Sequence, residues 1–215
     1  MRERVQRGGI ESDKTAVLIS LCAWCTVVGD YTSQALISSL LFNHFPTDQI
    51  VGEEDSTELQ TPENATTKQN IVRLANEALS ESLSISSEEE CWSRVKGEGS
   101  SKSEEEWLAI IDKGNSKGGK EGRHWALDPI DGTKGFLRGG QYAVCLGLLE
   151  AGKVVLGVMG CPNLPLDPKN PEGEKGAIFV AVKGQGAFQV SPLSLLSLLS
   201  SSSLMQTGYR VAFFR

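Results

Sequence analysis

Apolar residues recur at helical spacing in three segments of the first half of the chain. A recurrence every three to four residues is typical of a helix that buries one face. The predicted helices cover residues 30–44, 67–80 and 104–111. Asp30 stands where an N-cap or first-turn acid belongs, and Pro46 ends the first helix because proline cannot continue it. Residues 49–52 predict a short strand that runs into an acidic turn.

Strand-like patterning replaces the helical spacing from residue 124 onward. A strand is predicted over 124–127, and two hairpins follow with strands over 142–150, 154–160, 177–182 and 187–190. Glycine-containing turns join the paired strands, as is usual for short hairpin connections. Helices followed by a strand meander predict an α+β fold with a large, mainly antiparallel sheet.

Three segments depart from this pattern. Residues 81–103 are rich in Ser and Glu and predict a mobile surface loop, whereas residues 191–215 begin with a Ser/Leu tract and predict no domain. The ten apolar residues 16–25 predict an insertion within a domain over 1–190. The wider apolar run 16–28 has 13 residues, short of the ~20 that a membrane-spanning helix needs.

Charge and cysteine content narrow the function classes. The chain has 27 acidic and 21 basic side chains, a net charge of −6, which excludes a globally basic nucleic-acid-binding protein. An acidic protein that handles anions needs a metal or a local cluster of cations. Five cysteines are too few for a disulfide scaffold of this length and favour the reducing cytoplasm. Cys22 and Cys25 form a CxxC, interpreted as two buried thiols in preference to a redox pair.

Two acidic clusters, 53–55 and 128–131, each follow a predicted strand. Pro129 fixes its own φ and favours an extended Asp128, so Asp128 and Asp131 could point at one place with the carbonyl of Ile130 between them. Carboxylate and carbonyl oxygens are the ligands that Mg²⁺ prefers. The pattern therefore predicts a magnesium site.

A phosphate site is predicted beside it. Gly132 and Thr133 would place their amides at the N-terminus of a following helix, where bound phosphate is favoured. The alternative is that these acids are solvated turn formers, since Asp-Gly is a common turn dipeptide.

Both clusters lie in segments that resemble a known family. The segments are Val51-Gly52-Glu53-Glu54-Asp55 and the run from Trp125 to Phe136. They resemble the lithium-sensitive, Mg²⁺-dependent phosphatases of the inositol monophosphatase superfamily. Lys134-Gly135, where inositol monophosphatases typically have Thr-Asn, makes the 3'(2'),5'-bisphosphate nucleotidases the most similar branch. The resemblance implies a layered α/β sandwich, and it covers residues 11–14 and 28–190.

The resemblance also implies roles for individual residues. Glu53, Asp128, the Ile130 carbonyl and Asp131 would bind Mg²⁺. Asp30 and Thr133 would orient or activate the attacking water, and Gly132 with Thr133 would contact the phosphate.

The implied reaction removes the 3'-phosphate of adenosine 3',5'-bisphosphate, giving AMP and phosphate, with 3'-phosphoadenylyl sulfate as a second substrate. An inositol polyphosphate 1-phosphatase-like activity is the alternative within the enzyme class. The implied partner is this small nucleotide, with no nucleic acid and no membrane, and the oligomeric state stays open.

The chain also departs from the family pattern. Family members carry a further metal-binding Asp in a Trp-Asp context, together with the residues that hold the adenosine, in their second half. No Trp-Asp follows Val190. This departure is the basis for the alternative to an active enzyme: a truncated, catalytically impaired family member with a largely missing C-terminal domain, weakened Mg²⁺ binding and little or no phosphatase activity.

Overall fold

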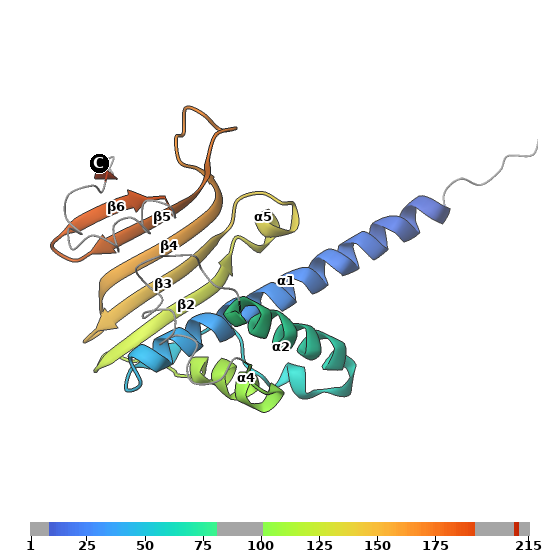
Figure 1. The fold of residues 1–215 in the computed structure, drawn as a ribbon, viewed down its shortest axis with the longest axis horizontal. Coiled ribbons are helices and arrows are strands. Elements are labelled where there is room, and N and C mark those ends of the chain that lie inside the picture. Colours follow the sequence, from blue (N-terminus) through green and yellow to red (C-terminus); the bar gives the residue numbers. More distant parts are fainter. Residues whose placement is uncertain (1–8, 81–100, 192–208, 211–215) are drawn as a thin grey trace, which may run out of the picture.

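A long first helix packs against one face of a twisted β-sheet, and two further helices pack on that helix (Figure 1). The computed structural model describes residues 9–80, 101–191 and 209–210, with side chains described over 25–80 and 101–191. The helices are α1 (Gly9–His44), α2 (Ala65–Ser80), α4 (Glu104–Ile111) and α5 (Thr133–Leu137), with short 3-10 turns at Glu58–Gln60, Pro62–Asn64 and Asp112–Gly114. The strands are β1 (Gln49–Val51), β2 (Arg123–Asp131), β3 (Ala143–Glu150), β4 (Lys153–Pro165), β5 (Lys175–Val182), β6 (Gly186–Val190) and β7 (Tyr209–Arg210).

The described strands form one sheet in which spatial order follows chain order from β1 to β7. β1 pairs with β2 in parallel, and every later neighbouring pair is antiparallel. The predicted α+β class and mainly antiparallel sheet are confirmed. The parallel pair matters most for function, because the carboxyl ends of β1 and β2 lie at the same edge of the sheet.

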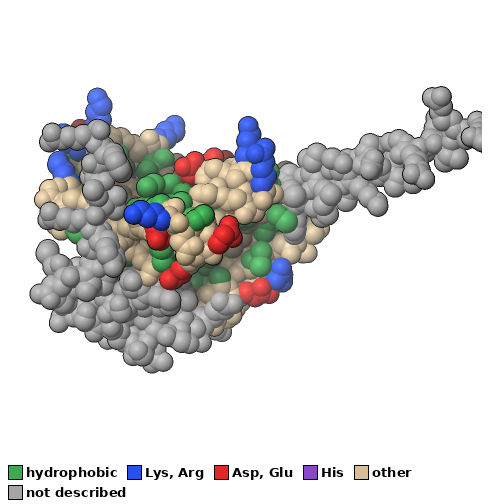
Figure 2. Space-filling view, turned by 90° about the horizontal axis from the view of Figure 1, so that it is seen from above, with side chains coloured by type: hydrophobic (Ala, Val, Ile, Leu, Met, Phe, Trp, Pro, Cys, Tyr) green, Lys and Arg blue, Asp and Glu red, His purple; other side chains and the backbone are tan. Residues whose placement is uncertain are grey.

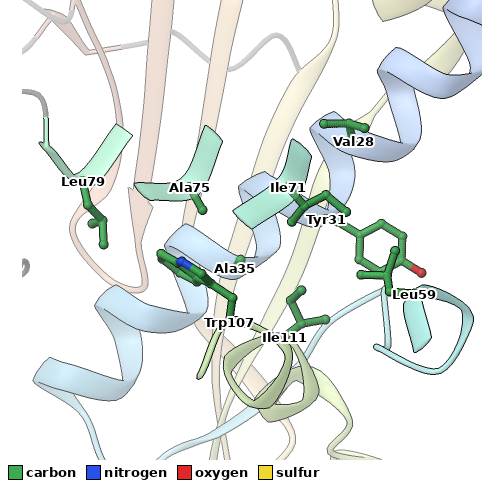
Figure 3. Packing of buried hydrophobic residues seen from close by; sticks show 9 residues of the cluster. All are labelled: Val28, Tyr31, Ala35, Leu59, Ile71, Ala75, Leu79, Trp107 and Ile111. Atoms are coloured by element: carbon green, nitrogen blue, oxygen red, sulfur yellow. The ribbon is translucent and has the colours of Figure 1, made fainter. Parts of the chain in front are cut away.

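The three larger helices share one apolar core (Figure 3). Trp107 and Ile111 of α4 have no exposed surface, and they pack with residues of α1 and α2. The buried members are Val28, Tyr31, Ala35, Leu59, Ile71, Ala75, Leu79, Trp107 and Ile111. The Trp107 indole N–H donates to Oδ1 of Asn76 at 3.0 Å, so the polar atom of this buried ring has a hydrogen-bond partner. Each large side chain buried here contributes about 1.5–3 kcal/mol.

A second cluster attaches α1 to the sheet. Leu41 of α1, Ile50 of β1 and Trp125 of β2 are buried together. The Trp125 indole N–H donates to Asp48 Oδ2 at 3.0 Å, and Arg123 pairs with the same carboxylate oxygen at 3.0 Å. These contacts hold the C-terminal part of α1 across β1 and β2.

The first helix starts much earlier than predicted. α1 begins at Gly9, so residues 16–25 lie inside a continuous helix, and Asp30 is a mid-helix residue, not its cap. Gly29 is the main helix-weakening residue before Asp30, and a single glycine costs a helix only about 1 kcal/mol. Gly29 also suits a close approach, because a Cβ there would lie 3.0 Å from Cδ1 of Ile130.

β2 is longer than the strand predicted over 124–127 and includes the acidic segment that was expected to follow it. The strand does not end at Leu127 but continues to Asp131, which pairs with Ala143. The register shifts between Asp128 and Asp131, around Pro129, which has no N–H to donate. β4 likewise continues beyond the predicted 160 to Pro165.

Several predictions fall partly or wholly outside the described residues. Residues 81–100 of the predicted mobile loop lie outside the described residues. The end of that predicted loop is described: Ser103 caps α4 and forms a capping box with Glu106. Of the segment predicted to form no domain, Tyr209–Arg210 pairs with β6. Cys25 is exposed and free, so the prediction of a buried thiol is wrong there. Within the described ranges, no helix has the length and apolar character needed to cross a membrane.

Candidate functional site

The predicted acidic residues meet at the carboxyl ends of β1 and β2. Glu53 and Glu54 follow β1 after Gly52, while Asp128 and Asp131 lie in the last part of β2. Asp30 reaches the same place from α1, where burial and the charges of Glu54, Glu53 and Asp128 act on it. The parallel pairing of β1 with β2 explains this convergence of residues that are far apart in sequence.

Burial raises the pKa of every one of the four innermost carboxyls. It raises the pKa of Asp30 to about 7, with repulsion from Glu54, Glu53 and Asp128 adding to the effect. The pKa of Glu53 is raised by burial and by Asp128, and that of Asp128 by burial and by Asp131. Burial also raises the pKa of Glu54, against the opposing hydrogen bond from Tyr31. Four such carboxyls in one place favour protons or a cation.

The donor set suits a hard divalent cation. Oδ1 of Asp128 is buried and has no hydrogen-bond partner within the described part of the chain, which is costly for a carboxylate. The Glu53 and Asp128 carboxyls share a hydrogen bond, which raises the pKa of Glu53. Oxygen ligands of this kind are those that Mg²⁺ selects. Among the described residues, however, no three His, Cys, Asp or Glu side chains are already arranged as a metal-holding group.

The turn after β2 is built on glycines. Gly132 adopts φ 90°, a left-handed conformation that favours glycine, and it leads directly into α5. The Thr133 hydroxyl lies 3.5 Å from the Ile130 carbonyl oxygen, to which it donates. A Cβ on Gly135 would lie 1.9 Å from the Gln141 carbonyl oxygen, so the turn needs glycine at this position. The predicted helix start after Asp131 is thus present, although α5 has only five residues.

A groove of about 860 Å³ runs across the sheet from the carboxylates of Glu53 and Asp128. Glu53 and Asp128 line it where it meets β1 and β2. Small residues contribute to its floor: Ala126, Gly147, Gly157, Ala181 and Ala187. Figure 2 shows acidic and hydrophobic side chains next to one another on one face of the molecule. A space of this volume is in the range of small-molecule sites.

Two residues of the site were not predicted. Gln34 is fully buried in α1, and its amide bonds to the main chain of Glu53 and Glu54. Tyr31 is buried one turn before it, and burial together with Glu54 raises the pKa of its phenol. A polar residue among the apolar positions of a helix is the signal that could have drawn attention to Gln34.

Comparison with known proteins identifies the family. A profile of the inositol monophosphatase family matches residues 24–211. The chain belongs to this family. The match includes every predicted site residue, from Asp30 to Thr133, and the resemblance inferred from the two acidic segments is confirmed.

Similar curated proteins are bisphosphate nucleotidases. The chain is 47% identical over 165 residues to the 3'(2'),5'-bisphosphate nucleotidase of Schizosaccharomyces pombe, covering 76% of this chain and 43% of the relative. It is 49% identical over 164 residues to 3'(2'),5'-bisphosphate nucleotidase 1 of Candida albicans, covering 75% and 42%. For 3'(2'),5'-bisphosphate nucleotidase 1 of Arabidopsis thaliana the identity is 45% over 190 residues, covering 84% and 49%. The chain therefore spans less than half the length of these relatives.

Among solved structures, inositol monophosphatase II from Staphylococcus aureus MSSA476 aligns with 80% of this chain and 49% of its own. The sequence identity is 13% and the TM-score is 0.29. This likeness is too weak to support an argument about the site.

Proposed function

We propose that this chain carries the cation-binding part of a Mg²⁺-dependent phosphomonoesterase that removes the 3'-phosphate of adenosine 3',5'-bisphosphate. The observation that carries the proposal is the meeting of Asp30, Glu53 and Asp128 where β1 and β2 end, in a chain 47–49% identical over 164–165 residues to bisphosphate nucleotidases. 3'-Phosphoadenylyl sulfate, which has the same 3'-phosphate, is the proposed second substrate.

Metal dependence is general in the inositol monophosphatase family. The residues proposed to hold the cation here are Glu53, Asp128, Asp131 and the carbonyl of Ile130. When bound, a divalent cation would supply the positive charge that neutralises the phosphate oxygens and stabilises the leaving alkoxide. The unpartnered buried oxygen of Asp128 and the raised pKa of its neighbours support this assignment, since a cation would relieve both.

Asp30 is the proposed proton acceptor. Burial, the largest cause, raises its pKa in the metal-free chain toward the range in which a general base is most effective. In the proposed reaction the water oxygen bonds to phosphorus, the water proton passes to Asp30, the bond from phosphorus to the 3'-oxygen breaks, and the departing 3'-oxygen takes up a proton from solvent. Thr133 is proposed to orient the water, and the amides of Gly132 and Thr133 to contact the phosphate. The products are AMP and inorganic phosphate.

A second candidate, the alternative left open by the sequence, is a chain that binds the cation without hydrolysing a nucleotide. An inositol polyphosphate substrate is the alternative within the family. The reaction is proposed to take place in the cytoplasm, which suits the free thiols of the described cysteines Cys25, Cys145 and Cys161.

The test is phosphate release by the purified full chain in Mg²⁺, measured in parallel on adenosine 3',5'-bisphosphate and on an inositol polyphosphate. We expect release from the nucleotide that is lost on adding EDTA and in Asp128→Asn. Glu121→Gln, a change of an exposed loop acid, is the matched control and should keep the wild-type rate. Preference for the inositol substrate would overturn the nucleotide assignment. Cation binding without any release would overturn catalysis and support the second candidate.

A further inference from the structure

Gln34 occupies a point where three parts of the chain meet. Its side chain belongs to α1 and has no exposed surface. The amide lies between the turn that follows β1 and the end of α4. A fully buried amide is retained in a protein only when its polar atoms are bonded, so its partners show what it is for.

The partners of the Gln34 amide are mainly the two peptide groups that carry the predicted site acids. Its Oε1 accepts from the N–H of Glu53 at 3.0 Å and from the N–H of Glu54 at 2.9 Å. Its Nε2 donates to the carbonyl of Glu54 and, at 3.2 Å, to the carbonyl of Ile111. A glutamine amide can accept two and donate two hydrogen bonds, so the group is fully used.

Two glycines make room for this amide. A Cβ on Gly52 would lie 2.6 Å from Oε1 of Gln34, and a Cβ on Gly114 would lie 2.7 Å from its Nε2. The two glycines are themselves joined by a hydrogen bond from the Gly52 N–H to the Gly114 carbonyl at 2.8 Å. The packing leaves the amide one orientation and leaves the Glu53–Glu54 backbone little freedom to turn.

From this arrangement we infer that Gln34 is a positioning residue, which directs the carboxylates of Glu53 and Glu54 toward Asp30 and Asp128 and thereby sets the affinity for a divalent cation. The inference rests on the proposed function, since it concerns the same cation site. Gln34 itself does not bind the cation, because its amide oxygen is committed to two backbone N–H groups. Groups that orient metal ligands typically change metal affinity by 10- to 100-fold when removed.

Asn76 provides a matched comparison. It is also an amide that joins separate elements, bonding the N–H and carbonyl of Lys102 at 2.8 and 2.9 Å and the Trp107 indole at 3.0 Å. None of these partners belongs to an acidic site residue. Loss of Asn76 should therefore weaken the fold without changing the geometry of the carboxylates.

The experiment measures Mn²⁺ binding by electron paramagnetic resonance of the free ion, with the full chain as wild type, Gln34→Met and Asn76→Leu. Thermal unfolding without metal is measured on the same samples. We expect Gln34→Met to bind Mn²⁺ at least 10-fold more weakly, and Asn76→Leu to stay within 2-fold of wild type although it lowers the unfolding temperature. Equal Mn²⁺ affinity of wild type and a folded Gln34→Met would overturn the inference alone. A wild type that binds no Mn²⁺ would overturn the proposed cation site and, with it, this role for Gln34.

Amide hydrogen exchange of the unchanged chain gives a second measurement, which decides if Gln34→Met does not fold. The N–H groups of Glu53 and Glu54 should exchange at least 100-fold more slowly than that of the exposed Lys117. Exchange of both at the rate of Lys117 would mean that Gln34 does not hold this turn, and the inference would fail.

Discussion

Replacing Asp30 by asparagine removes a carboxyl whose ionisation is opposed by its surroundings. Its pKa is raised from 3.8 to about 7 by burial and by Glu54, Glu53 and Asp128. The difference is about three pH units, or ~4 kcal/mol at 1.36 kcal/mol per unit. Because Asp30 is only partly buried, solvent screens part of this electrostatic penalty. We therefore expect about half of it, ~2 kcal/mol, to appear in the free energy of unfolding.

The sign of the pH dependence of the free energy of unfolding follows from the protons bound in the folded and unfolded chain. Below about pH 4 Asp30 is protonated in both the folded and the unfolded chain, so it contributes nothing to the pH dependence. Between pH 4 and 7 the folded chain holds the proton more tightly, so the free energy of unfolding of the metal-free protein falls as pH rises. Above pH 7 the whole penalty is present. Asp30→Asn should therefore stabilise the metal-free protein by ~2 kcal/mol at pH 8 and by less at pH 5.

Urea unfolding followed by tryptophan fluorescence, in EDTA at pH 5, 6.5 and 8, measures this difference. Glu121→Gln is the control, because it also neutralises one acid but lies in an exposed loop away from the site. A gain that is equal at all three pH values, or largest at pH 5, would show that the carboxyl cluster does not raise the pKa of Asp30 as described.

Three further predictions concern the core, the turn after β2 and the cation. Ile111→Val should lower the free energy of unfolding by ~1 kcal/mol in urea, because one buried methyl group is lost from a fully buried side chain; no change would place Ile111 outside the core. Gly135→Ala should cost about 3 kcal/mol or prevent folding, since its Cβ would lie 1.9 Å from the Gln141 carbonyl oxygen; a stability equal to that of Gly160→Ala, whose Cβ would meet nothing within 4 Å, would contradict this. Saturating Mg²⁺ should raise the unfolding temperature more at pH 8 than at pH 5, because protons compete for the carboxylates, and Asp128→Asn should abolish the rise.

Much of the local structure follows from short-range patterns. The apolar spacing of 67–80 and 104–111 predicts α2 and α4 nearly to the residue, and the capping acids of α4 mark its start. The turns at 151–152 and 183–185 follow from their glycines. These elements are predictable because each depends on residues within a few positions of one another.

The ends of helices and strands are predicted less well where they depend on pairing or packing with segments elsewhere in the chain. β2 continues through its acidic segment because β3 pairs with it as far as Asp131. α1 extends back to Gly9 although Asp30 has the character of a cap, and Gly29 is tolerated inside the helix where Ile130 lies close.

The sequence alone supplied the chemistry of the site: acids after two strands, Gly-Thr after the second, and motifs that resemble a phosphatase family. Only the tertiary structure decided which acids act on one another and what holds them. Asp30, Glu53 and Asp128 share an environment because α1 crosses a parallel pair of strands. Gln34 bonds to Ile111, 77 positions away, as well as to Glu53 and Glu54. Such contacts arise from folding of distant segments onto one another, and no local pattern of apolar and polar residues encodes them.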